Sequence, residues 1–82
     1  MTPKLPRDLS GRQLAKVLSR FGYEISRQTG SHLRLTTHTS GEHRITIPAH
    51  DSLKIGTLSG ILGEIARHLE ISKTEVIDRL FR

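Results

Sequence analysis

The first apolar positions of the chain recur at helical spacing. They lie three and four residues apart, as the buried stripe of a helix does: Leu14, Val17, Leu18 and Phe21. Ser10 and Gln13 stand three residues apart just before this stripe and form a capping box. Gly22 follows the last apolar position, where a left-handed cap is favoured. The pattern predicts a helix over residues 11–21.

The spacing then changes from the helical period to a period of two. Leu33 and Leu35 alternate with polar residues, and so do Ile45 and Ile47. Such alternation is typical of an antiparallel sheet with one buried and one solvent-exposed face. Three short strands are therefore expected, over residues 23–28, 31–37 and 44–47. We expect Ile25 on the buried face and these polar residues on the exposed face: Ser26, Gln28, His32, Arg34, Arg44 and Thr46.

Helical spacing returns in the last third of the chain. After a loop over residues 49–55, Thr57 is expected to cap a second helix that carries a stripe of Leu and Ile. Gly60 and Gly63 lie inside this helix, where each costs up to about 1 kcal/mol relative to alanine, and they could allow close packing on the sheet. A short last helix is expected after a second capping box, formed by Ser72 and Glu75.

The order of these elements predicts the fold class. The chain has 82 residues, which is enough for one domain over residues 1–82 and not for two. Helices that flank a three-stranded meander in sequence pack most simply on its apolar face. We therefore expect an α+β, two-layer α-β-β-β-α domain: a three-stranded antiparallel sheet with helices on one face, followed by a short C-terminal helix.

The chain is basic, and its basic residues are unevenly distributed. Its formal net charge is +5, which indicates an acidic partner such as nucleic acid. Residues 1–50 hold eight Lys and Arg against three acidic residues, whereas residues 51–82 hold five of each. The neutral second part argues against a DNA-binding helix-turn-helix made by the last helices. Three basic residues four apart on the first helix form either a solvated face or a track for phosphates: Arg12, Lys16 and Arg20.

Composition excludes several other classes of protein. The chain has no Cys, and therefore no disulfide, thiolate nucleophile or Cys-based zinc site. It has no apolar run of membrane-spanning length and no apolar signal sequence, so we expect a cytoplasmic protein without a membrane partner. His38 and His43 flank the second hairpin turn, but they lack a third ligand at suitable spacing. Exposed hairpin histidines are the simpler explanation, and we expect neither a metal nor another cofactor.

The histidines are the candidates for chemistry, because a pKa of about 6.5 allows proton transfer near neutrality. His32 begins the second strand directly after Gly30 and Ser31, on the expected exposed face. Gly30 leaves room for a ligand backbone, and Ser31 can donate a hydrogen bond. Arg34 points the same way and offers a guanidinium fork that suits phosphate. His50, after Pro48, could orient its loop or touch a ligand, and we expect His68 to be an exposed helix residue.

Three stretches of the sequence resemble one family. They are Ser10-Gly11-Arg12-Gln13-Leu14 continuing into Phe21-Gly22-Tyr23; Arg27-Gln28-Thr29-Gly30-Ser31-His32; and Ile47-Pro48-Ala49-His50 followed by Lys54-Ile55-Gly56-Thr57-Leu58 and Ile61-Leu62. In this order and spacing they are similar to the HicA (YcfA-like) family of toxin ribonucleases. The resemblance spans nearly all of residues 5–66.

The resemblance implies a fold, an activity and a partner. The fold would be similar to a double-stranded-RNA-binding domain. The activity would be that of an endoribonuclease, an mRNA interferase, with His32 of the Gly-Ser-His motif as its single catalytic residue. The partner would be a HicB-type antitoxin that holds the toxin inactive. Many members end soon after the second helix, so residues 66–82 are an extension that could be extra core, a dimer contact or an antitoxin contact.

A mechanism without a metal is consistent with these residues. The 2′-hydroxyl of RNA is the nucleophile, and His32 would act as general base or general acid. Arg34 and Arg44 would stabilise charge on the phosphate, with help from Gly30 and Ser31. His50 is the best remaining candidate for a second acid–base group, and Arg12 and Lys16 for further RNA contacts.

An alternative function has the same fold but no catalytic activity. The protein would then be a non-catalytic RNA-binding module that recognises A-form RNA through its shape and its 2′-hydroxyls. Replacement of His32 would leave RNA binding intact, and the parent protein would show no cleavage.

Overall fold

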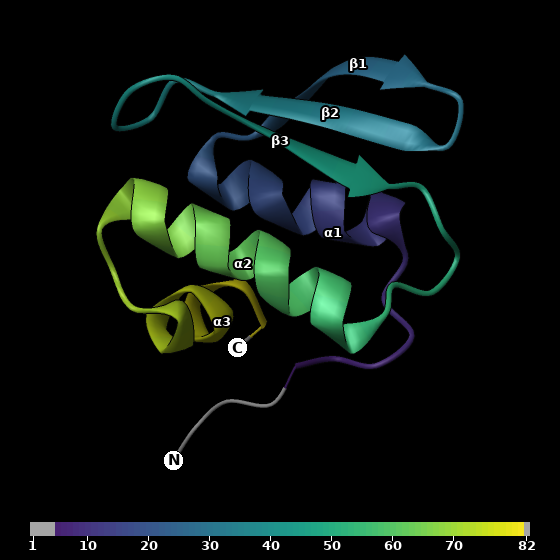
Figure 1. The fold of residues 1–82 in the computed structure, drawn as a ribbon. Coiled ribbons are helices and arrows are strands. Elements are labelled where there is room, and N and C mark those ends of the chain that lie inside the picture. Colours follow the sequence, from purple (N-terminus) through teal and green to yellow (C-terminus); the bar gives the residue numbers. More distant parts are fainter. Residues whose placement is uncertain (1–4, 82) are drawn as a thin grey trace.

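The elements of the structure, a computed structural model that describes residues 5–81, follow the expected order (Figure 1). They are α1 (Gly11–Leu18), the 3-10 turn η1 (Ser19–Phe21), β1 (Glu24–Thr29), β2 (His32–Thr37), β3 (His43–Pro48), α2 (Ile55–Leu69) and α3 (Lys73–Phe81). The three strands form one antiparallel sheet in the order β1-β2-β3. Figure 1 shows α1 and α2 on one side of this sheet and α3 beyond α2. The α+β architecture expected from the sequence is confirmed.

Helix α1 begins and ends as its sequence predicts. The Ser10 hydroxyl accepts a hydrogen bond from the Gln13 amide at 3.0 Å, and the Gln13 side chain accepts one from the Ser10 amide at 2.8 Å. The last three residues tighten into the 3-10 turn, and Gly22 closes it in the left-handed region at φ 80°. The capping box and the glycine cap are both confirmed.

The core lies between the sheet and the helices. Leu33 and Leu35 of β2 and Ile45 and Ile47 of β3 are buried, as their alternation predicts. Full burial of an aliphatic side chain of this size contributes about 1.5–3 kcal/mol. The other buried apolar residues are Leu14, Ala15, Leu18, Tyr23, Leu53, Leu58, Ile61, Leu62, Ile65, Ala66, Val76, Ile77 and Leu80. Several of these lie beyond position 65, so the C-terminal extension adds to the core.

Strand β1 departs from the prediction. Its six side chains are all exposed, and Ile25, which the alternation places on the buried face, is 49% exposed. β1 is an edge strand, and a bulge between Ile25 and Arg27 interrupts its pairing with β2. Bulges bend the strand that contains them, so β1 does not hold its side chains against the helices. Ile25 does lie opposite the buried Leu35, on the face where it was expected, but its side chain is half-exposed rather than buried.

Helix α2 begins two residues before the predicted cap. Lys54 is the N-cap, and its carbonyl accepts the first helical hydrogen bond, from the Leu58 amide at 3.0 Å. Thr57 is therefore inside the helix, and the prediction that it caps α2 is wrong. Nothing lies within 4 Å of where a Cβ on Gly60 or Gly63 would be, so these glycines do not serve close packing on the sheet.

Helix α3 forms half of its predicted capping box. The Ser72 hydroxyl accepts a hydrogen bond from the Glu75 amide at 3.0 Å, while the Glu75 carboxylate pairs with Arg79 at 2.9 Å. No helix within residues 5–81 has the length and apolar character needed to cross a membrane.

Candidate functional site

A two-residue turn places His32 at the start of the central strand. Gly30 and Ser31 connect β1 to β2, and Gly30 has a positive φ of 54°. A positive φ at the first position of a two-residue hairpin loop is typical of a type II′ turn and favours glycine. The Ser31 carbonyl accepts a hydrogen bond from the Ala49 amide at 2.6 Å, which ties the turn to the loop after β3.

The start of α1 closes against the same loop. The Gly11 amide donates to the His50 carbonyl at 3.0 Å, and a Cβ on Gly11 would lie 2.0 Å from the Pro48 carbonyl oxygen. Only glycine fits at this close approach. Pro48 is also the partner of His32 across β2 and β3. The turn, the loop and the start of α1 together fix the end of the sheet at which His32 lies.

The bulge in β1 determines which side chains stand beside His32. Residues directly opposite in a ladder project to the same face of the sheet. Beyond the bulge, Arg27 lies opposite Arg34 and Thr29 lies opposite His32. We define the outer face as the side of the sheet away from the helices, which His32 and Arg34 share. Arg27 and Thr29 therefore belong to the outer face.

Gln28 lies opposite Leu33, which is buried on the helix side of the sheet. The expectation that Gln28 stands beside His32 on the exposed face is therefore wrong, because the bulge reverses the alternation. Ser26, by contrast, is on the outer face as expected, since its hydroxyl lies 2.9 Å from that of Thr36.

His32 and Arg34 line one shallow depression on the outer face, which we call the His32 hollow. Its volume is about 280 Å³, and it is lined by Arg27, Thr29, His32, Arg34 and Thr46. Between residues 5 and 81, the imidazole of His32 has no hydrogen-bond, ion-pair or ring partner. It is the only lining side chain of a type that titrates near neutral pH. The hollow can therefore present a histidine and two guanidinium groups to an anion.

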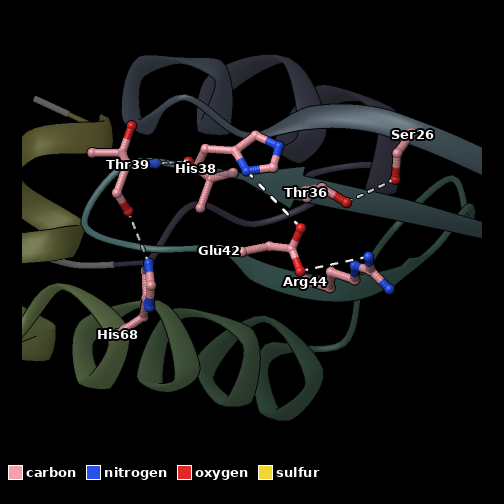
Figure 2. A network of polar contacts seen from close by, with 8 residues as sticks. Ser26, Thr36, His38, Thr39, Glu42, Arg44 and His68 are labelled. Carbon is pink, nitrogen blue, oxygen red and sulfur yellow. Dashed lines mark hydrogen bonds and ion pairs between the residues drawn. The ribbon is translucent and has the colours of Figure 1, made fainter.

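Arg44 lies on the same face but in a neighbouring depression of about 470 Å³, which we call the Arg44 hollow. Its guanidinium pairs with Glu42 at 3.5 Å, and Glu42 also lies 4.0 Å from His38 (Figure 2). Arg27 and Arg34 line both hollows. The Arg44 hollow is mixed in charge, whereas the lining of the His32 hollow contains no acidic residue.

Five of the predicted site residues do not line either hollow. Arg12 and Lys16 are exposed on α1, which covers the opposite side of the sheet (Figure 1). His50 is exposed in the loop after β3, where its carbonyl rather than its ring makes the described contact. Ser31, like Gly30, belongs to the turn beside His32 and contributes no lining side chain.

Two other histidines, His43 and His68, form a separate network at the far end of the strands. Nδ1 of His43 lies 2.7 Å from the Tyr23 phenol oxygen, and its ring stacks on His68 with centroids 4.5 Å apart. His68 is thus half-buried, and the expectation that it is simply exposed is wrong. His38 does not join His43, and the described part of the chain holds no group of three side chains that could bind a metal ion.

Sequence reasoning missed two residues of the His32 hollow, Arg27 and Thr29. Their assignment depends on the bulge, and the run from Ser26 to Thr29 contains no apolar residue that could reveal which positions face the helices. Arg27 begins one of the three stretches that resemble the HicA family, but its position on the outer face follows only from the strand register.

Comparison with known proteins adds one match. A family model described as "HicA toxin of bacterial toxin-antitoxin" matches residues 11–69, from the start of α1 to the end of α2. No curated protein and no solved structure matched the chain. The matched segment contains all five residues that line the His32 hollow.

Proposed function

The chain belongs to the HicA toxin family, because the family model matches well over half of it, and we propose that the protein is an endoribonuclease toxin with His32 as its catalytic residue. One observation carries this proposal: His32 lies exposed on an open sheet face, in a hollow that it shares with unpaired guanidinium groups. This hollow is smaller than the clefts of roughly 300–1,000 Å³ that hold small organic ligands, and it is open to solvent. A phosphodiester of a long polymer suits it better.

The proposed reaction uses the nucleophile that RNA itself supplies. The 2′-hydroxyl oxygen forms a bond to the adjacent phosphorus, and the bond from phosphorus to the 5′-oxygen breaks. The 2′-hydroxyl loses its proton and the 5′-oxygen gains one, leaving a 2′,3′-cyclic phosphate and a 5′-hydroxyl. His32 performs one of these proton transfers and water performs the other. A positioned acid or base contributes about 10²–10⁴-fold to the rate.

Arg34 supplies the electrostatic part of the mechanism. It projects from the same strand face as His32, two residues further on, and its guanidinium has no ion-pair partner in residues 5–81. Donors that are already in place stabilise charge that develops on phosphate oxygens in the transition state. Arg44 contributes less, because Glu42 already pairs with its guanidinium. No step requires a metal or another cofactor.

Family membership supplies the biological context of the proposal. A toxin of a toxin–antitoxin system has an antitoxin partner. We propose that this partner is a HicB-type protein, that the substrate is mRNA, and that both are met in the cytoplasm.

The test compares cleavage of a long RNA in EDTA by the parent protein and by its His32→Ala and His50→Ala variants. We expect the parent to cut, His32→Ala to be inactive while folded by circular dichroism, and His50→Ala to cut, because His50 does not line the hollow. Cleavage of DNA at the same rate would refute a mechanism that uses the 2′-hydroxyl. Binding of RNA without any cleavage by the parent would instead establish the non-catalytic RNA-binding module.

A further inference from the structure

Two arginines face each other across β1 and β2 beside His32. Arg27 and Arg34 are direct partners in the ladder, and both side chains are exposed. No carboxylate within residues 5–81 forms an ion pair with either guanidinium. Like charges directly opposite each other on neighbouring strands are destabilising. The free protein therefore maintains two like charges on opposite residues that line the His32 hollow, where an anion would relieve their repulsion.

The bulge at Ser26 creates this pair. Before the bulge, Ile25 lies opposite Leu35. If that register continued, Arg27 would lie opposite Leu33 and would project toward the helices. The extra residue in β1 shifts the pairing by one, so that Arg27 meets Arg34 instead. Bulges next to functional sites commonly redirect side chains in this way.

Hydrogen bonds of Ser26 hold the bulge in place. Its hydroxyl donates to the Arg34 carbonyl at 3.3 Å. The same hydroxyl lies 2.9 Å from the Thr36 hydroxyl, as Figure 2 shows. Ser26 therefore fixes β1 to β2 at the point where the register changes. It touches the backbone of one arginine of the pair and directly precedes the other in the chain.

We propose that Arg27 and Arg34 form a clamp for a backbone phosphate of RNA beside His32, and that Ser26 is the positioning residue that assembles the clamp. Guanidinium forks match the geometry of phosphate oxygens. No Phe, Tyr or Trp lines the His32 hollow, so recognition there rests on the RNA backbone rather than on base stacking. Both arginines also line the Arg44 hollow, so the two hollows adjoin on the outer face.

The clamp has a signature that a merely structural arginine lacks. Arg27→Gln removes the repulsion and should raise the Tm of the free protein by about 1–4 °C. The same substitution should weaken RNA binding about tenfold, because it removes a charged contact to phosphate. An arginine that only supports the fold would lower the Tm when it is replaced.

The experiment measures binding of a 2′-O-methyl RNA oligonucleotide, which lacks the nucleophile and stays intact whether or not the protein is a nuclease. Arg27→Gln should reduce the slope of log affinity against log salt by about 0.7, the value for one phosphate contact on a single strand. Arg67→Gln is the matched control, since it removes the same charge from an exposed position on α2 that lines neither hollow. Arg67→Gln should leave both the salt slope of binding and the Tm close to those of the parent protein.

Ser26 is tested through its dependence on Arg27. Ser26→Ala should weaken binding in the parent protein and have no further effect in the Arg27→Gln variant, because Ser26 acts only through the clamp. Additive losses would refute the positioning role. Unchanged binding and salt slope in Arg27→Gln would refute the clamp.

This inference rests on the proposed function, but the two fail in different ways. If the parent binds the oligonucleotide through Arg27 and cuts no RNA, the ribonuclease proposal fails and the clamp stands. If the parent cuts RNA and Arg27→Gln cuts it with unchanged kcat/KM and salt dependence, the clamp fails and the ribonuclease proposal stands.

Discussion

The phenol oxygen of Tyr23 lies 2.7 Å from Nδ1 of His43, and this contact joins the residue before β1 to the first residue of β3. Burial, with a smaller contribution from Glu64, raises the pKa of Tyr23 to about 12, so the phenol stays protonated at neutral pH. His43 stacks in turn on His68, whose Nε2 lies 2.9 Å from the Thr39 carbonyl oxygen (Figure 2). The network links the sheet to α2 at the end opposite His32.

This network predicts that the protein loses stability in mild acid. Burial, followed by the neighbouring His68, lowers the pKa of His43, and Glu64 opposes the shift. Below the ordinary histidine pKa of about 6.5 the unfolded chain binds a proton that the folded chain resists. The free energy of unfolding therefore falls as the pH drops through 6.5 toward the lower folded value. Urea unfolding at a series of pH values should show that His43→Gln is less sensitive to pH than the parent, and parallel curves would contradict the prediction.

The single tyrosine of the chain allows a direct test of the buried phenol. Because the pKa of Tyr23 is raised to about 12, the native protein at pH 11 should show phenol absorbance, whereas urea-unfolded protein should show phenolate. Between pH 10 and 12 the unfolded chain loses this proton more readily, so stability falls as the pH rises through that window. A phenolate spectrum at pH 11, with the native fold verified by circular dichroism, would show that the phenol is not held as described.

The sequence predicted the central part of the site well, for a specific reason. In β2 the apolar residues Leu33 and Leu35 alternate with His32 and Arg34, so the period of two assigns each side chain to a face without any knowledge of the partner strands. The helix-side residues are buried, and His32 and Arg34 line one hollow.

Strand β1 could not be assigned in the same way. Ile25 is the only apolar residue between Glu24 and Thr29, and one apolar position does not define a period. The register there depends on hydrogen bonds of Ser26 to the neighbouring strand, which no local pattern encodes. Arg27 was therefore missed as a site residue, and Gln28 was assigned to the wrong face.

Two glycines of the helical layer should respond to alanine in opposite ways. A Cβ on Gly11 would lie 2.0 Å from the backbone oxygen of Pro48, so Gly11→Ala should force α1 away from the loop that supports His32, at a cost of about 1–3 kcal/mol. A Cβ on Gly60 meets nothing within 4 Å, and Gly60→Ala should stabilise the helix interior by about 0.5–1 kcal/mol. Urea unfolding measures both, and a stable Gly11→Ala variant would contradict the close approach.

The basic stripe of α1 distinguishes two ways of binding RNA. Arg12 and Lys16 lie on the helical side of the sheet and line neither hollow of the outer face. If RNA crosses only the outer face, these charges act at long range and are screened at physiological salt. The double variant Arg12→Gln/Lys16→Gln should then weaken single-stranded RNA binding about threefold or less and leave its salt slope unchanged. Arg34→Gln alone should reduce that slope by about 0.7. If instead the double variant reduces the salt slope, Arg34→Gln does not, and duplex RNA is the preferred ligand, the nucleic acid lies on α1. That result is expected of a module that recognises the shape of A-form RNA.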